Sequence, residues 1–525
     1  MNLKAVADKY SAFIVIFFFL AFLWLGLGVY KDYGVFWDEF IQYVVGHVNL
    51  RFAAGVDDRL LTFGDHNYLE KYFDPAFEMF LAGVEKARRI PPDDLRAIYF
   101  SRHLFVFFMF YAGTIFFYRL CRKQFGHWLP ALLGAAFLVL SPRIFAETFY
   151  NSKDLPFTAM FTISMFTLSR YLEKKTFPRA FLHALTTGLA TDIRVMGVMI
   201  VFLTAFLFIL DILCDKEKAP RDLRTWGTGV FYILSAAGFI VLFRPILWNS
   251  PAYHFIAMLK QFSQFPWEGK VLYLGNTIMA YDVPWHYNFV WIGVTTPVLY
   301  LVLFIFGFVF LGTELLRKPK DFYAQNKILF LSLCWVVVPL AGVIALHSVL
   351  YDGWRHMYFI YPGMLIIAVA GLKKIFGLFE RSLTAKAAGT IALISCLAAT
   401  AADMARTHPH QYVYFNFLAG KNMRAVKENF DLDYWGLSYR QALEYIVRTD
   451  KSPAIKIYAA NWPGELNAFL LPPADRKRLE FVRDFRGAKY FISNYREHKE
   501  EYPFENEIFA VKFRDAKIMV VYKFI

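Results

Sequence analysis

The sequence has few cysteines, little charge and no glycine-rich phosphate loop, and each shortage excludes a class of protein. Its four cysteines lie in or beside hydrophobic stretches and form neither a disulfide framework nor a metal-ligand spacing. There is no Walker A sequence and no GxGxxG opening a helix, so we expect this chain to bind no cytosolic ATP. An internal repeat and a low-complexity tract are also missing. The cysteines are Cys121, Cys214, Cys334 and Cys396.

Charged residues make up only 19% of the 525 positions, whereas 57% are hydrophobic. A soluble protein of this length would need far more charged surface. Phenylalanine (58 residues) and tyrosine (31 residues) are abundant, as expected for lipid-facing helices with aromatic belts at the membrane interfaces. The composition therefore predicts one large membrane domain plus a smaller remainder.

Hydrophobic stretches long enough to cross a bilayer, which takes about 20 residues, recur along the first 402 positions. The fifth and sixth are separated only by residues 191–194, so one long broken helix is an alternative to two helices. No small-residue cleavage site follows the first stretch, which we interpret as a retained helix. The expected spans are 11–30, 100–120, 128–146, 155–171, 178–191, 195–214, 226–247, 288–314, 327–347, 356–374 and 384–402.

The formal net charge of +14 indicates either a positive-inside membrane topology or an anionic ligand. If the N-terminus is cytoplasmic, five successive inside loops are short and basic, which favours this orientation. The loops also account for much of the positive charge without a nucleic-acid partner. Their basic residues are Arg119, Arg122 and Lys123; Arg170, Lys174, Lys175 and Arg179; Lys216, Lys218, Arg221 and Arg224; Arg317, Lys318, Lys320 and Lys327; and Lys373, Lys374, Arg381 and Lys386.

This topology leaves segments 31–99, 248–287 and 403–525 outside the cytoplasm. In the first segment, apolar residues recur at helical spacing over 39–50 and 76–85, as in helices that lie on a membrane surface. The last segment is richer in charge and predicts a small α/β domain. Its expected strands are 454–460, 489–493, 508–513 and 517–524, and its expected helices are 439–449 and 475–485.

Two acidic motifs fall on the outer side of the predicted membrane domain. Trp37-Asp38-Glu39 follows the first span, and a carboxylate there is suited to be a general base for an acceptor hydroxyl. Asp154 ends the short outer loop 147–154, just before Pro156. The alternative for both Asp38 and Asp154 is that they only cap the helices that follow.

Outward-facing basic residues form a third candidate group. Arginine pairs bidentately with phosphate oxygens and stays charged when partly desolvated. The alternative is that each long side chain reaches the lipid headgroups on its own. The group comprises Arg194, Arg244, His347, Arg355 and His356.

Together these motifs and the number of spans resemble the GT-C glycosyltransferases, membrane enzymes that use polyprenyl-phosphate sugars. The nearest likeness is to glycosyltransferase family 39, which includes protein O-mannosyltransferases and the aminoarabinose transferases acting on lipid A. The Asp38-Glu39 pair is similar to the mannosyltransferase motif. Segments similar to bacterial members of the family are 141–146, 151–154, 351–356 and 433–439.

The resemblance implies an α-helical polytopic membrane protein with a GT-C bundle of about eleven helices (1–402) and a small extracytoplasmic α/β domain (403–525). It implies an enzyme of the bacterial inner membrane, in contact with membrane lipids. This enzyme would transfer a hexose or pentose, with inversion, from a polyprenyl-phosphate sugar donor to a lipid, glycan or protein acceptor. No cofactor is required, although a divalent metal is possible. The implied catalytic residues are Asp38, Glu39 and Asp154, and the implied donor phosphate-binding residues are Arg355, His356, Arg244 and Arg194.

One position departs from the family pattern. Aminoarabinose transferases often carry an aromatic-x-Lys-Pro-Pro segment whose lysine meets the donor phosphate. Here the comparable stretch is 72–78, with Asp74 in place of that lysine and Lys71 nearby. That phosphate contact is therefore not predicted for Asp74.

Two other classes of protein remain alternatives. A transporter or flippase of a lipid-linked precursor would suit a broken helix at 191–194 and buried charges. Transporters usually show internal repeats and short outer loops, however, and this sequence shows neither. A scaffold whose C-terminal domain recruits partners would leave the acids at the interface unexplained.

Overall fold

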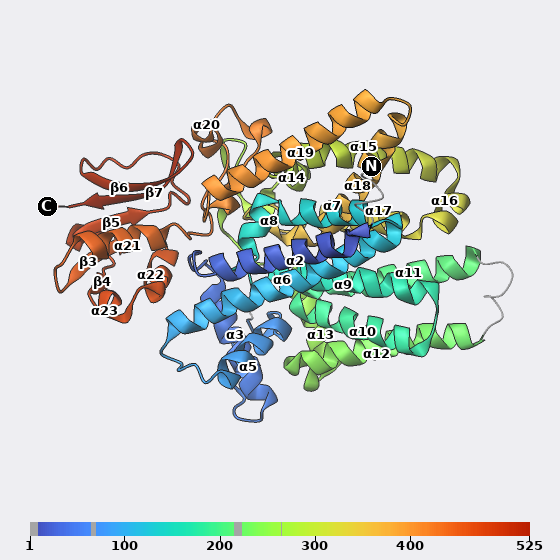
Figure 1. Cartoon of the computed structure of the whole chain (residues 1–525). Coiled ribbons are helices and arrows are strands. Elements are labelled where there is room, and N and C mark those ends of the chain that lie inside the picture. The colour runs from blue at the N-terminus through green and yellow to red at the C-terminus, as the bar shows by residue number, and fades with distance from the viewer. Residues whose placement is uncertain (1–8, 65–69, 215–222, 264, 525) are drawn as a thin grey trace.

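The computed structural model describes residues 9–64, 70–214, 223–263 and 265–524. A long bundle of helices carries a sheet-containing C-terminal domain at one end (Figure 1). The chain is an integral membrane protein, because many of its helices are long and apolar enough to cross a bilayer. The structure confirms the predicted α-helical membrane protein with a small C-terminal α/β domain.

Every predicted span falls on a helix. Within the described residues, eight helices are long and apolar enough to count as candidate membrane spans, so the expected number of about eleven is not confirmed. The helices are α2 (Ser11–Val29), α6 (Leu95–Phe125), α7 (Trp128–Val139), α9 (Asp154–Glu173), α10 (Phe177–Ile193), α11 (Val198–Cys214), α12 (Leu223–Phe243), α15 (Val298–Arg317), α17 (Lys327–Ala345), α18 (Tyr361–Leu378) and α19 (Leu383–Arg406).

Helices α9 and α10 are missing from the candidate spans because polar side chains line the face that each turns toward its neighbours, and α10, with 17 residues, is also short. Thr167 Oγ1 lies 2.9 Å from His183 Nδ1 and 2.9 Å from Thr186 Oγ1, and His183 Nε2 lies 2.8 Å from Thr204 Oγ1 of α11. All four side chains are buried. Hydropathy read from sequence treats these residues as if they met lipid, whereas they satisfy one another inside the bundle.

Two predicted spans, 128–146 and 288–314, are interrupted. The span at 128–146 is α7 followed by the short α8 (Pro142–Glu147), and the span at 288–314 is α14 (Tyr287–Thr295) followed by α15. Pro142 and Pro297 lie at these breaks, because proline lacks the N–H of a continuing helix and keeps the preceding residue extended. Between the predicted fifth and sixth spans, Arg194 is extended and the turn η2 (Val195–Gly197) follows, so α10 and α11 are separate helices.

The basic loops gather at the end of the bundle away from the C-terminal domain. Asp211, near the end of α11, is ion-paired with both Lys175 and Lys327. The small helix α16 (Pro319–Gln325) lies at the same end (Figure 1). Of the predicted inside residues, Lys216, Lys218 and Arg221 lie outside the described residues. Short basic connections thus share one end of the bundle, as predicted.

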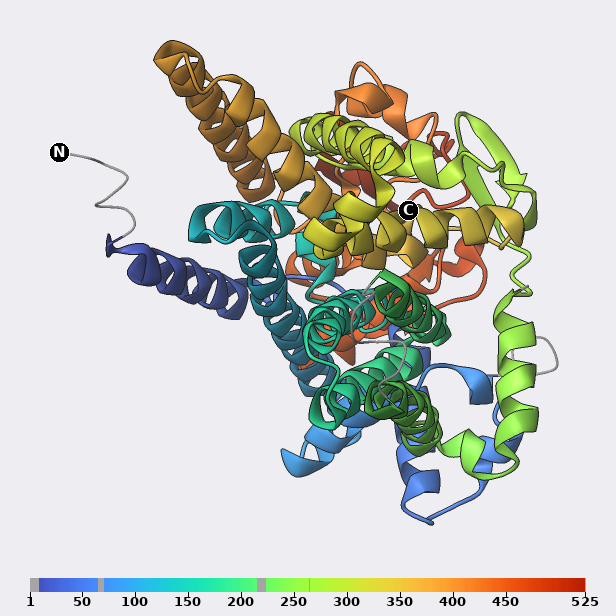
Figure 2. The same ribbon diagram turned by 90° about the vertical axis from the view of Figure 1, so that its right-hand side faces the viewer.

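Segment 31–99 contains helices at both predicted positions, α3 (Glu39–Ala53) and α5 (Ala76–Ala87), together with α4 (Arg59–Thr62) and the turn η1 (Glu70–Tyr72). Gly46 lets α3 and α5 approach closely, because a Cβ there would lie 2.4 Å from the Glu78 carbonyl oxygen. The segment that begins after α12 forms η4 (Pro245–Trp248), α13 (Pro251–Ser263) and an antiparallel hairpin of β1 (Lys270–Tyr273) and β2 (Asn276–Met279). Figure 2 shows this light-green segment along one flank, beside the blue first segment.

The C-terminal domain is a five-stranded sheet of order β4-β3-β5-β7-β6, with α21 (Tyr439–Thr449) as predicted. The predicted helix at 475–485 is wrong. Its Leu479–Phe481 forms an edge strand that pairs in parallel with β3, because backbone pairing at an open sheet edge overrides local helix propensity. The strands are β3 (Ile455–Ala459), β4 (Leu479–Phe481), β5 (Tyr490–Ser493), β6 (Glu507–Phe513) and β7 (Ala516–Lys523), and the other short helices include α20 (Met423–Lys427), α22 (Pro463–Asn467) and α23 (Pro473–Arg476).

This domain is docked on the loop that carries the first acidic motif. Val35 N donates to Asn467 Oδ1 and Asn467 Nδ2 donates to Val35 O, both at 2.9 Å. Arg440 Nη1 donates to Tyr33 O at 3.0 Å, and Arg96 Nε donates to Leu470 O at 2.8 Å. Asp38 and the C-terminal domain therefore lie at the same end of the molecule.

Candidate active site

Asp38 precedes α3 but does not cap it. Its side chain makes no capping hydrogen bond, so the capping alternative fails for this residue. The carboxylate is 30% exposed and lies 3.5 Å from Nη1 of Arg355, which is only 2% exposed. It lines a cleft of about 340 Å³ together with Lys153 and Asp352. Asp38 is thus a carboxylate that remains accessible from the cleft while it faces a buried cation.

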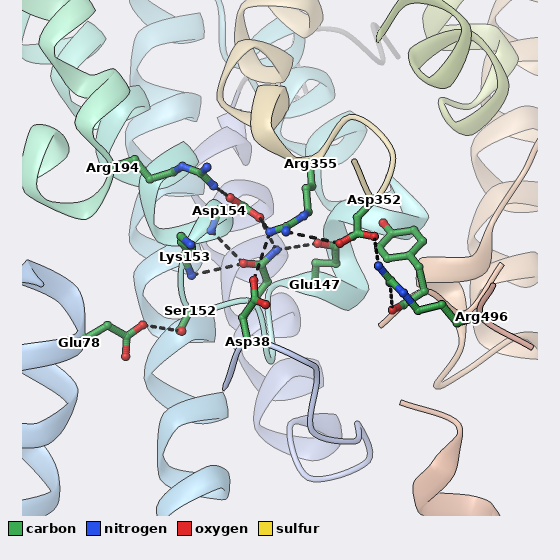
Figure 3. A network of polar contacts seen from close by, with 12 residues as sticks. Asp38, Glu78, Glu147, Ser152, Lys153, Asp154, Arg194, Asp352, Arg355 and Arg496 are labelled. Atoms are coloured by element: carbon green, nitrogen blue, oxygen red, sulfur yellow. Dashed lines mark hydrogen bonds and ion pairs between the residues drawn. The ribbon is translucent and has the colours of Figure 1, made fainter. Parts of the chain in front are cut away.

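Asp154 begins α9, and its carboxylate is directed at two arginines (Figure 3). It is ion-paired with Arg194 and lies 3.4 Å from Nη1 of Arg355, and only 1% of its side chain is exposed. The Asp154 backbone N–H is bonded instead to Asn151 Oδ1, at 2.9 Å. Asn151 also donates to the Asp154 carboxylate, at 3.0 Å. Asp154 therefore positions cations and does not act as the helix cap.

Arg355 is at the centre of this network. Its guanidinium lies 3.4–3.5 Å from the carboxylates of Asp38, Asp154 and Asp352, longer than a tight charge-assisted hydrogen bond. Its Nε has no hydrogen-bond partner among the described residues. The rings of Tyr351 and Trp435 flank it, with centroids 4.9 and 4.8 Å from its Cζ. A buried guanidinium with loose ion pairs and a spare donor is suited to receive an anion.

The C-terminal domain supplies a cation that sequence reasoning missed. Arg496 pairs with Asp352 at 3.0 Å, donates to Tyr434 O at 2.6 Å and lies over the Trp37 ring. Nothing in the sequence links position 496 to the site beyond its presence in the predicted outer domain. Lys153 was also left out of the predicted site, although it belongs to the 151–154 motif. Both residues line the cleft.

His356 lies beside Arg355, in the turn η6 (Arg355–Ile360), and its ring contacts Tyr351 edge-on at a centroid distance of 4.8 Å. Its buried Nδ1 has no hydrogen-bond partner in the described part of the chain. The structure therefore brings together Asp38, Asp154, Arg194 and the adjacent pair Arg355-His356 from four separated positions of the sequence.

Glu39, adjacent to Asp38 in the sequence, faces a different partner. Its Oε1 lies 3.0 Å from His103 Nε2, and both side chains are fully buried. The same interior holds Arg102 between Glu78 and Glu85, at 2.6 and 2.7 Å. Successive residues at a helix start diverge by about 100°, which separates the two carboxylates. Glu39 therefore does not share the cleft with Asp38, and we assign it a structural position.

Arg244 is held in a closed network. Its side chain is fully buried, with Nη2 2.8 Å from Asp74 and Nε 2.8 Å from Asp192. It also donates to the carbonyl oxygens of Tyr72 and Thr191, at 3.0 and 3.2 Å. These contacts leave little capacity for a phosphate, so Arg244 is better described as a structural cation. Asp74, the departure from the family pattern, is one of its two counter-ions.

Arg244→Leu should therefore destabilise the protein, by about 3–5 kcal/mol, because two buried carboxylates lose their cation. Thermal inactivation of the detergent-solubilised protein would measure the loss. Adding Asp74→Asn and Asp192→Asn should restore part of it, and the exposed Arg486→Leu is the control expected to be nearly silent. If Arg244→Leu kept normal thermal stability but lost donor binding, Arg244 would instead be assigned to the phosphate site.

A metal site is not evident from side-chain clustering. Within the described ranges there is no group of three or more His, Cys, Asp or Glu side chains placed to hold an ion. The site carboxylates Asp38 and Asp154 both face guanidinium groups.

Comparisons with known proteins found likeness only among solved structures. No family model matches the chain, and no curated protein does. Two crystal structures of ArnT from Cupriavidus metallidurans are each 12% identical to this chain, with a TM-score of 0.49. The match to the structure bound to undecaprenyl phosphate covers 96% of this chain and 97% of that one, and the match to the apo structure covers 97% and 98%. The Archaeoglobus fulgidus oligosaccharyltransferase in complex with zinc and sulfate is 11% identical with a TM-score of 0.48, and the match covers 88% of this chain but 64% of that one.

Proposed function

We propose that this protein is an inverting glycosyltransferase that moves a sugar from a polyprenyl-phosphate donor to a lipid, glycan or protein acceptor outside the cytoplasm. One observation carries the proposal. An accessible carboxylate, Asp38, shares a cleft with Lys153 and lies next to Arg355, which Asp154 links to Arg194. A base beside a cluster of cations is what an acceptor hydroxyl and a departing phosphate require.

In the proposed reaction, Asp38 accepts the proton of the acceptor hydroxyl as its oxygen attacks the anomeric carbon. The bond from that carbon to the phosphate oxygen breaks, and the polyprenyl phosphate leaves from the opposite face with the electron pair. Arg355 stabilises the negative charge that grows on the phosphate, with Arg194 and Lys153 nearby. A single displacement inverts the anomeric centre, and because phosphate leaves readily no separate general acid is needed.

Mass spectrometry of lipid-linked sugars and surface glycans, with and without this protein in its host, tests the proposed function. Loss of the protein should leave one polyprenyl-phosphate sugar unused and one sugar missing from a surface lipid, glycan or protein. Unchanged surface glycans combined with a lipid-linked precursor trapped on the cytoplasmic side would favour a flippase instead.

Lys153 gives the proposal a pH dependence. Desolvation lowers the pKa of Lys153 to about 8, with Asp38 opposing the shift and Arg194 and Arg355 adding to it. The ammonium is charged below that pH and lost above it. Affinity for a polyprenyl-phosphate sugar should therefore fall by about three- to tenfold between pH 8 and pH 10. The range extends above 8 because a bound phosphate raises the pKa of the lysine beside it. Lys153→Arg should flatten the profile, and an equally steep profile in that variant would exclude Lys153.

We place the N-terminus and the basic loops in the cytoplasm and the cleft outside, in the inner membrane of a bacterium. Reporter fusions after Arg122, Lys175, Lys318 and Lys374 should all report cytoplasm, because basic residues near span ends are retained there. A fusion at the C-terminus should report the outside. A cytoplasmic C-terminus would overturn this orientation.

A further inference from the structure

The wall of the cleft next to Asp38 holds two hydrogen-bond donors that no residue in the described part of the chain satisfies. The carboxamide of Gln42 is 1% exposed and lines the cleft, and among the described residues its Nε2 has no partner. The buried Nε1 of Trp37, on the same wall, has none either. Leaving a buried donor unpaired costs about 1–3 kcal/mol, so two side by side indicate that a ligand supplies acceptor oxygens there.

Both donors are placed by the start of α3. Gln42 follows Asp38 by four residues, one helical turn, so the two side chains share a face of the helix. Trp37 directly precedes Asp38, and Arg496 covers its ring at 5.2 Å. A ligand that places a reacting oxygen at Asp38 therefore brings neighbouring oxygens within reach of Gln42 and Trp37.

An aromatic platform lies across the same cleft. Trp267 and Tyr351 are stacked, with ring centroids 4.1 Å apart and planes 21° from parallel, and both line the cleft. Gly269 lets the indole lie there, because a Cβ at that position would come within 2.2 Å of the ring. Flat aromatic rings offer an apolar surface to the C–H face of a sugar. The neutral donors and the platform are thus suited to a hydroxylated ring, whereas the phosphate belongs with Arg194 and Arg355.

We propose that these two sides of the cleft, which carry Trp37, Gln42, Trp267 and Tyr351, together form the subsite for the ring of the transferred sugar. Gln42 Nε2 and Trp37 Nε1 donate to its hydroxyl oxygens, and Trp267 packs against its C–H face. This inference rests on the proposed function, since it concerns the donor of that reaction. A cleft of about 340 Å³ holds one such ring, and pockets of this size are typical for small ligands.

The test compares two kinds of probe on the full-length protein in detergent. One is unsubstituted citronellyl phosphate, and the other is a panel of citronellyl phosphates carrying mannose, glucose, galactose, N-acetylglucosamine or arabinose. We expect at least one glycosylated probe to bind about tenfold more tightly than the bare phosphate. Gln42→Leu and Trp37→Phe, which remove the donors and keep the bulk, should each reduce that ratio about three- to tenfold, leaving the affinity for bare phosphate within twofold.

Trp267→Leu should also reduce the ratio, and Trp267→Phe should retain most of it because a ring remains. The matched control is Trp285→Phe, at an exposed tryptophan in the same outer segment. The subsite is overturned if the ratio is unchanged in the Trp37, Gln42 and Trp267→Leu variants, if these lose both probes equally, or if no sugar in the panel improves binding. A wild-type protein that binds neither kind of probe would instead contradict the proposed function itself.

Discussion

Asp38→Asn should lower the rate of sugar transfer by about 10²-fold or more while expression and melting temperature stay close to those of the wild type. The amide keeps the shape of the side chain but cannot accept the acceptor proton. Since Asp38 makes no capping hydrogen bond, the substitution removes no helix cap. The measurement is turnover of a polyprenyl-phosphate sugar by purified, reconstituted protein.

Asp32→Asn is the matched control for this experiment. Asp32 lies six positions earlier in the same segment of the chain, and it pairs with His408 at 2.9 Å, away from the cleft. Its rate should stay within about twofold of wild type, because surface ion pairs contribute little. Near-normal turnover in Asp38→Asn would exclude Asp38 as the general base and would point to another group on the cleft.

Arg355→Lys should lower turnover about 10- to 100-fold while weakening donor binding less. The leaving monoester carries more negative charge than the bound diester, so a cation in contact with it acts mainly in the transition state. Lysine keeps the charge but loses the planar fork that serves two phosphate oxygens at once. Arg355 is the strongest candidate because its ion pairs are long and its Nε is unpaired among the described residues.

Arg194→Lys and the exposed Arg486→Lys complete the series. Arg194 is already bound to the Asp154 carboxylate, so we expect a smaller loss there, and none at Arg486. Turnover and donor affinity should be measured separately for each variant. Normal turnover in Arg355→Lys with a large loss in Arg194→Lys would transfer the phosphate contact to Arg194, and normal turnover in both would leave it to Lys153 or backbone amides.

Much of this molecule was predictable from the sequence because the physical cause is local. Each predicted span lies on a helix, since a run of apolar residues has to form its own backbone hydrogen bonds. Alternation at 454–460, 489–493, 508–513 and 517–524 predicted four of the five strands of the C-terminal sheet. Asp38, Asp154 and Arg355 were identifiable because charge at membrane depth is expensive and indicates a role.

Partner choice, in contrast, was decided only by the tertiary structure. Arg244 and Arg355 are the same residue type at the same outer level of the predicted topology, but Arg244 is neutralised by Asp74 and Asp192 while Arg355 faces the cleft. Helix rotation sent Glu39 toward His103. Such pairings depend on how distant helices rotate and dock, which no spacing along the chain encodes.

The sequence by itself thus determined the long apolar helices, most of the strands and the acid that we propose as the base. The tertiary structure decided which charges are satisfied in the interior and which stay available, and it brought Arg496 from the C-terminal domain to the cleft. The physical reason is the range of the interactions. Burial and backbone hydrogen bonding act on each segment separately. Whether a charged side chain is neutralised depends instead on neighbours that can lie hundreds of residues away in the sequence, as Asp38 and Arg355 do.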